Sequence, residues 1–170
     1  YEIKNEFIKA KINSFGAELN SLQKNNNNFE YIWQADKNYW ARHSPVLFPI
    51  VGRLKEDTYI YKDKIYSLSQ HGFARDKEFE LLKKESDFIE FSLKNDEKTL
   101  EIYPFLFELN ISYKLENTKL IISYKIRNKS EDKMYFSIGA NPAFNISKGD
   151  FLEFENVEKT KRIEEHTSEL

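Results

Sequence analysis

Along much of this chain apolar and polar side chains alternate at a period of two, and this pattern limits the fold more than any other feature. The clearest case is a pair of runs at residues 105–115 and 119–128, which a short polar segment at 116–118 separates. Successive side chains of a strand point to opposite faces, so a period of two indicates a strand with one buried face. Two such runs joined by a short turn predict a long antiparallel hairpin, with Pro104 at its start.

Shorter runs of the same kind occur elsewhere in the chain. We expect further strands at residues 7–12, 17–22, 29–33, 64–68, 78–84, 87–93, 134–138 and 151–154, and a hairpin tip at the asparagines 25–28. Helix is expected only around residues 36–40. Aromatic side chains make up 15% of the chain, and they suit the half-buried faces of sheets. Many short strands together predict an all-β fold, an antiparallel β-sandwich.

Length and charge narrow the classes of protein. A chain of 170 residues is long enough for one domain with a substantial core. No repeat or linker divides it, so we expect residues 1–170 to form a single β-sandwich domain or the N-terminal part of one. The net charge is -2, with basic and acidic residues interleaved, which argues against a nucleic-acid partner.

The two ends of the sequence carry few signals. No apolar run approaches the roughly 18 residues of a membrane-spanning helix, and residues 1–4 lack the apolar centre of a signal peptide. We therefore expect a cytoplasmic protein with no membrane association. The chain starts without methionine and stops in a polar segment at 164–170, which leaves open both a complete domain and a fragment that is incomplete at its C-terminus.

Several kinds of chemistry find no support in the sequence. There is no cysteine, which excludes disulfides, thiolate metal sites and cysteine nucleophiles. The 5 glycines are scattered singly and form no phosphate-binding loop, and the 3 histidines have no metal-ligand spacing. No serine lies in a nucleophile elbow. We expect no cofactor and no metal, which leaves acid and base chemistry.

The segment His71-Gly72-Phe73-Ala74-Arg75 is the strongest candidate for a functional site. Histidine exchanges protons near neutral pH, and arginine offers a planar set of donors to hydroxyls or anions. Each residue also has a structural interpretation. His71 could be a turn histidine, and Arg75 could pair with Asp76 or Glu78 at the surface.

Two further residues are candidates. Arg53 ends an apolar run at residues 45–54, so its guanidinium must reach a cleft or find a partner, and we favour the cleft. Asn141 follows a strand that breaks at Gly139, and its alternative role is an Asn-Pro turn. The other histidines, at positions 43 and 166, carry no supporting pattern and are expected at the surface, whereas Trp33 is expected in the core.

Three segments in this order resemble the aldose 1-epimerase (galactose mutarotase) family: Gly52-Arg53-Leu54, residues 71–75, and residues 139–145. The resemblance is to the LacX-like, hexose-6-phosphate mutarotase-like branch, and it covers essentially the whole chain. It implies a β-supersandwich with a sugar in an open cleft and no cofactor. In that family a carboxylate takes the proton from the anomeric hydroxyl and a histidine protonates the ring oxygen.

The resemblance also implies roles for individual residues. His71 matches a catalytic-site histidine that hydrogen-bonds the sugar, Arg53 matches a substrate-binding arginine, and Arg75 matches a ligand for a sugar phosphate. Asn141 stands where the family has its second histidine, the general acid, and an amide cannot deliver a proton. Nothing after residue 145 resembles the segment that carries the family's catalytic glutamate.

Three interpretations follow. The first is a mutarotase-related enzyme that acts on a free or phosphorylated aldose, as a monomer or homodimer. The second is a non-catalytic carbohydrate-binding relative, in which Asn141 keeps a hydrogen bond to the sugar. The third is a structural β-sandwich module whose edge strands pair with another chain.

Overall fold

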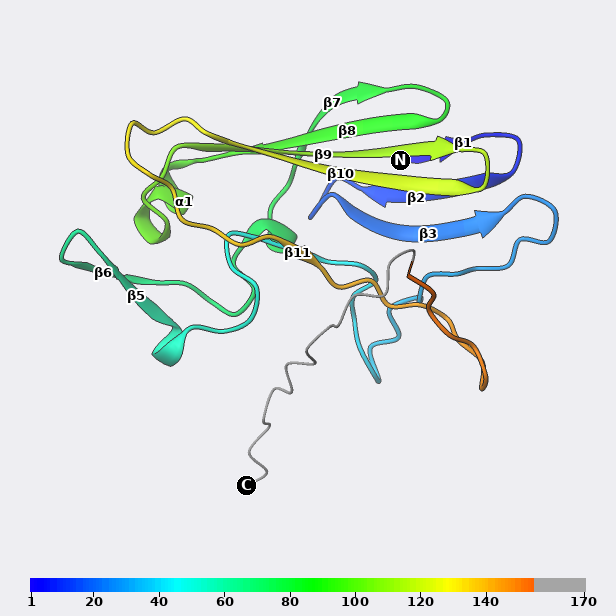
Figure 1. Cartoon of the computed structure of the whole chain (residues 1–170), viewed down its shortest axis with the longest axis horizontal. Coiled ribbons are helices and arrows are strands. Elements are labelled where there is room, and N and C mark those ends of the chain that lie inside the picture. Colours follow the sequence, from blue (N-terminus) through cyan, green and yellow to red (C-terminus); the bar gives the residue numbers. More distant parts are fainter. Residues whose placement is uncertain (155–170) are drawn as a thin grey trace.

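The computed structural model describes residues 1–154, and its strands form antiparallel sheets (Figure 1). One sheet has the order β1-β2-β3 and contains β1 (Glu2–Lys4), β2 (Ile8–Asn13) and β3 (Glu18–Lys24). A longer sheet has the order β10-β9-β8-β7 and contains β7 (Glu80–Lys84), β8 (Phe88–Lys94), β9 (Phe107–Glu116) and β10 (Lys119–Asn128). The expected all-β, antiparallel fold is confirmed.

Smaller elements connect these sheets. β4 (Val46–Leu47) pairs with β11 (Gly139–Ala140), and β5 (Thr58–Tyr61) pairs with β6 (Lys64–Ser67) in a separate hairpin. The helical segments are η1 (Lys55–Asp57), η2 (Ala74–Asp76) and α1 (Glu97–Ile102). Within residues 1–154 no helix is long and apolar enough to cross a membrane.

The β9–β10 hairpin has the register that the alternating pattern predicts, with Tyr113 opposite Ile122 and Ile111 opposite Tyr124. The side chains of Ile111 and Tyr113 are 0% and 1% exposed. A fully buried side chain of this size contributes roughly 1.5–3 kcal/mol to stability. Burial of this face therefore fixes the register, because a slip by one residue would turn the apolar side chains to solvent.

The three-stranded sheet packs beside the longer sheet, as Figure 1 shows. The Tyr113 hydroxyl crosses between them and donates to the Ala17 carbonyl at 2.6 Å. Tyr1 meets Phe91 edge to face, with ring centroids 5.6 Å apart. Both sheets contribute to one hydrophobic core.

The carboxylate of Glu30 joins the end of β3 to the following segment. It accepts hydrogen bonds from the Ser21 hydroxyl at 2.5 Å, the Leu22 and Ile32 N–H groups at 2.9 and 3.0 Å, and the Gln23 amide at 3.0 Å. Burial raises the pKa of Glu30, but these donors outweigh it and hold the pKa below its usual value. The charged form of Glu30 is therefore part of the folded structure.

Several predicted elements differ in the structure. Residues 134–138 and 151–154 are not strands, and residues 29–33 form only the isolated bridges of Glu30 with Gln23 and of Ile32 with Phe144. Side-chain alternation alone does not make a strand, because a ladder also needs a neighbouring backbone in register.

The sequence predicted a helix where the structure has none and missed the α-helix that it has. Residues 36–40 form a turn, in which the N–H groups of Tyr39 and Trp40 both donate to the Asp36 carbonyl. The α-helix α1 lies instead after Asp96, which forms a capping box with Thr99. The Asp96 carboxylate accepts from the Thr99 N–H at 2.6 Å, and this cap starts a helix too short to show a periodic pattern.

Candidate functional site

Three segments that are distant in the sequence, residues 45–54, 71–75 and 139–145, meet at one backbone junction. β4 lies at its centre, and β11 pairs with it on one side. The pairing continues beyond the strands, where the Asn141 N–H donates to the Pro45 carbonyl at 3.1 Å. The tertiary fold therefore places the third segment alongside the first.

The second segment meets the first at Phe48, the residue that follows β4. Phe48 and Gly72 form an isolated parallel bridge. The Phe48 carbonyl accepts hydrogen bonds from the N–H groups of Phe73 and Ala74 at 3.0 and 3.1 Å. Phe48 and Phe73 are both buried, so this connection belongs to the core.

His71 is held by Gly52 through two hydrogen bonds. The His71 N–H donates to the Gly52 carbonyl at 2.8 Å, and the Gly52 N–H donates to His71 Nδ1 at 3.0 Å. Because Nδ1 is an acceptor here, the proton of the neutral ring lies on Nε2. His71 has a φ of +67°, a left-handed conformation that these contacts maintain. The ring is thus oriented as a hydrogen-bond donor through Nε2.

Arg53 lies next to this pair and forms a bidentate ion pair with Asp57 in η1. Its Nε and Nη2 atoms donate to the two carboxylate oxygens at 2.8 and 2.6 Å, and the Arg53 side chain is 65% exposed. The hydrogen bond from Arg53 holds the pKa of Asp57 below its usual value, and Asp57 raises the pKa of Arg53. A guanidinium has five N–H donors, so this pairing leaves Arg53 capable of contacting a ligand as well.

Arg75 lies in η2 and has partners within the chain. Its Nη2 donates to the Gln70 carbonyl at 2.8 Å, and its Nε lies 3.5 Å from Asp76. Asp76 also pairs with Arg42 at 2.7 Å. These contacts match the surface ion pair with Asp76 that the sequence allowed, while the role of Arg75 as a phosphate ligand stays a prediction.

Asn141 is exposed, and its segment is fixed on both sides by backbone hydrogen bonds. Beyond it the Trp33 N–H donates to the Ala143 carbonyl at 3.0 Å. The Asn145 amide donates to the carbonyls of Glu30 and Ile32, at 3.0 Å each. Residues 139–145 therefore form a bridge between residues 31–33 and β4.

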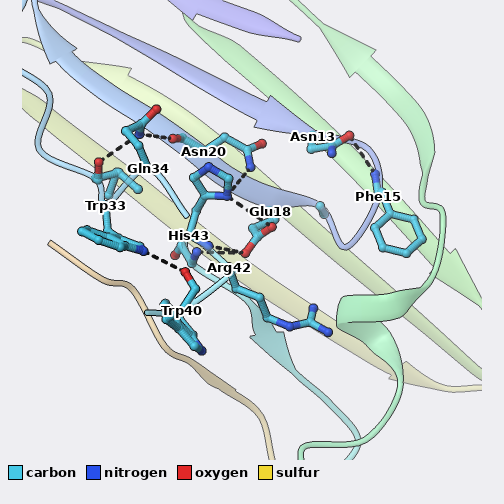
Figure 2. Close-up of polar contacts among 12 residues, drawn as sticks. Asn13, Phe15, Glu18, Asn20, Trp33, Gln34, Trp40, Arg42 and His43 are labelled. Carbon is cyan, nitrogen blue, oxygen red and sulfur yellow. Dashed lines mark hydrogen bonds and ion pairs between the residues drawn. The ribbon is translucent and has the colours of Figure 1, made fainter. Parts of the chain in front are cut away.

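The polar cluster around His43 is the part of this region that sequence reasoning missed (Figure 2). One Glu18 oxygen accepts the N–H groups of His43 and Ser44 at 3.0 and 2.9 Å, and the other lies 3.9 Å from His43 Nδ1. Nδ1 is also 3.0 Å from the Asn20 amide nitrogen. The His43 side chain is 23% exposed, so its expected place at the open surface was wrong.

The sequence offered little signal for this cluster. Glu18 and Asn20 follow the ordinary polar alternation of a strand, and His43 reaches them only through tertiary contact. The His43 carbonyl accepts the Ala143 N–H at 2.9 Å, which connects the cluster to the segment of Asn141. His166, the remaining histidine, lies outside the described residues.

Trp33 is half-buried rather than fully in the core. Its indole N–H donates to the Trp40 carbonyl at 2.9 Å, as Figure 2 shows, and its ring meets Tyr39 edge to face at 6.1 Å. Tyr39 is 81% exposed. An aromatic surface of this kind therefore stands next to the bridge of residues 139–145.

A cavity of about 610 Å³ adjoins the junction on the side of the β5–β6 hairpin. Its lining is mainly apolar and includes Pro49, Ile50 and Leu54 together with Tyr59 and Tyr61 of the hairpin. Within residues 1–154 no three side chains of His, Cys, Asp or Glu group closely enough to hold a metal ion.

Comparison with known proteins agrees with this arrangement. Residues 1–168 match the sequence model of the family described as aldose 1-epimerase, so the chain belongs to the aldose 1-epimerase family. Protein LacX (chromosomal) of Lactococcus lactis subsp. lactis is 36% identical over 150 residues, which are 85% of this chain and 50% of that protein. The chain thus spans about half the length of the curated relatives it matches.

Solved structures show the same relationship. A galactose mutarotase related enzyme from Lactobacillus acidophilus is 44% identical, with a TM-score of 0.85, over 89% of this chain and 51% of that one. A galactose mutarotase-like protein from Lactobacillus casei ATCC 334 is 39% identical, with a TM-score of 0.84, over 86% of this chain and 50% of that one. These similarities confirm the galactose mutarotase-like fold.

Proposed function

We propose that this chain supplies part of the sugar cleft of an aldose 1-epimerase, which interconverts the α and β anomers of an aldose or an aldose 6-phosphate. One observation carries the proposal. The backbone junction around β4 brings Arg53, His71 and Asn141, which are far apart in the sequence, into one region. Membership of the aldose 1-epimerase family supports a sugar as the ligand.

Each of these residues has donors that suit a sugar. His71 donates from Nε2, because the Gly52 N–H occupies Nδ1. Arg53 can donate to neighbouring hydroxyls, and the Asn141 amide both donates and accepts. In this proposal residues 1–170 belong to a single β-sandwich domain that holds these donors along the segment around β4, with Asn141 beside Pro45 before the strand and His71 beside Gly52 after it.

The proposed reaction opens and closes the sugar ring without a net change of atoms. A base removes the proton from the hydroxyl on C1, the C1–O5 bond breaks toward O5, and O5 takes a proton from an acid. Rotation about the C1–C2 bond and the reverse steps give the other anomer. Positioned acid and base groups each contribute about 10²–10⁴-fold to such a rate.

A second function remains in competition because of Asn141. Its amide binds a hydroxyl well but transfers no proton, which suits a carbohydrate-binding protein without catalysis. The rate of approach to anomeric equilibrium distinguishes the two functions. It is followed by NMR or polarimetry with the complete gene product, for glucose, galactose and their 6-phosphates. The enzyme predicts a rate well above that of buffer. A buffer-level rate with saturable sugar binding supports the binding protein, and no sugar binding at all contradicts both.

A further inference from the structure

We propose that His43 is the proton-transfer residue on the Asn141 side of this cleft, held by Glu18 and Asn20. The inference rests on the proposed epimerase function and names a group that the motif segments do not contain. The carboxamide of Asn141 has no ionisable proton near neutral pH. A reaction that needs an acid at this side therefore needs another residue.

His71 is poorly suited to that task. An imidazolium donates from both nitrogens, so it cannot accept the hydrogen bond from the Gly52 N–H. With the Gly52 N–H on Nδ1, the His71 ring presents its proton from Nε2 as a hydrogen-bond donor.

His43 has surroundings that accommodate both of its protonation states. The Asn20 amide lies 3.0 Å from Nδ1 and can turn over, so its oxygen can accept from Nδ1–H both in the imidazolium and in the neutral ring that remains after Nε2 gives up its proton. The second Glu18 oxygen, 3.9 Å from Nδ1, supplies the opposite charge when the ring is protonated. Arg42, the neighbouring cation, is paired with Asp76. His43 and His71 are the histidines of residues 1–154, and the Nδ1 neighbour is a rotatable side-chain amide at His43 and a backbone N–H at His71.

The position of His43 relative to Asn141 also fits. The His43 carbonyl accepts the Ala143 N–H and the Pro45 carbonyl accepts the Asn141 N–H, so residues 43–45 run alongside residues 141–143. Diagonal neighbours in such a pairing lie about 7–8 Å apart. One sugar ring with its hydroxyls can span this gap, which lets the His43 ring and the Asn141 amide contact the same ligand.

Two protons move when the sugar ring opens. The imidazolium of His43 gives its Nε2 proton to O5 as the C1–O5 bond breaks, and a carboxylate base takes the proton of the C1 hydroxyl. The products are an open-chain aldehyde with a hydroxyl at C5, a neutral His43 and a protonated carboxylic acid. Ring closure on the other face returns both protons to the groups that supplied them.

Rates of anomer interconversion for the complete gene product and its variants test this inference. His43→Gln is expected to lower kcat by about 100-fold or more, with KM changed by less than about 3-fold. Asn141→His added to His43→Gln is expected to recover at least about 10-fold of the lost rate, because it restores an imidazole at the neighbouring backbone position. Lys37→Gln, an exposed change in the nearby turn, serves as the control and should keep the wild-type rate.

The outcomes separate the inference from the function on which it rests. A wild-type rate equal to buffer removes the epimerase function and the role of His43 together. A wild-type protein that is active, with His43→Gln equally active, overturns the role of His43 alone. A slow His43→Gln variant that Asn141→His does not improve assigns His43 a structural part and also overturns the inference.

Discussion

Replacing Gly72 by alanine tests the backbone junction on which the site depends. Gly72 has a φ of +68°, and a Cβ atom there would lie 2.3 Å from the Phe48 carbonyl oxygen and 2.7 Å from Pro49 Cδ. Contacts below 3.0 Å are essentially never seen for a real Cβ atom. Phe48 and Gly72 would have to move apart at the point where the two segments meet.

The expected cost has three parts. The left-handed backbone disfavours alanine by about 1–2 kcal/mol. Forcing extra volume into a packed position costs about 1–3 kcal/mol. Moving the Phe48 carbonyl weakens its hydrogen bonds from Phe73 and Ala74, each of which contributes about 0.5–1.5 kcal/mol. With both hydrogen bonds lost, the total for Gly72→Ala is a loss of about 3–8 kcal/mol in the free energy of unfolding.

Gly52→Ala is the matched control. Gly52 has a φ of +84°, so it pays the same conformational cost, but a Cβ atom there meets no described atom within 4 Å. Its loss should be about 1–2 kcal/mol. Urea unfolding followed by circular dichroism and by tryptophan fluorescence measures both variants, and the midpoint of Gly72→Ala should fall much further than that of Gly52→Ala.

The comparison can refute the reasoning directly. Equal losses in the two variants would mean that the Phe48 and Gly72 segments separate at little cost. The junction would then not be the rigid element that holds His71 beside β4. A loss in Gly52→Ala larger than that in Gly72→Ala would contradict the close approach itself.

Three further predictions follow from particular contacts. Glu30→Gln should lower the free energy of unfolding by about 1–3 kcal/mol at neutral pH, since the charged carboxylate satisfies several donors. The folded-state pKa of Glu30 lies below its ordinary value of 4.5. Its contribution to stability is therefore present above pH 4.5 and is lost as the pH falls through the folded-state pKa, so the stabilities of wild type and variant should converge in acid. A constant difference between them down to about pH 3 would contradict the assignment. Tyr113→Phe should cost about 1–3 kcal/mol by leaving the buried Ala17 carbonyl unpaired, and a neutral result in chemical denaturation would show that the bond adds nothing. Arg75→Gln should raise KM for an aldose 6-phosphate and leave KM for the free aldose unchanged, and equal effects on both sugars would exclude a phosphate contact.

The strands that the sequence predicted best are those whose partners are close in the chain. β9 and β10 are joined by a short turn, so the alternating residues that face the core can be recognised and paired without knowing the rest of the fold. Residues 29–33 show the same alternation, but their neighbours are residues 23 and 144. Alternation identifies which side chains prefer burial, and it does not say whether a backbone partner is available.

The candidate site divides in the same way. Arg53, His71, Arg75 and Asn141 could be selected because glycine, proline and charged residues mark unusual positions in the sequence. The contacts of His43 with Glu18 and Asn20 could not be foreseen, because 25 and 23 positions separate these residues and no spacing rule relates them.

By itself, the sequence determined the class of fold and its family. Its alternating apolar residues favour antiparallel sheets with one buried face, and its three motif segments resemble those of aldose 1-epimerases. Only the tertiary structure decided which backbone groups bind which side chains. It placed the Gly52 N–H on His71 Nδ1 and the Glu18 carboxylate beside His43. The physical reason is that burial preference is a local property of each residue, whereas hydrogen-bond partners depend on the position of the whole chain.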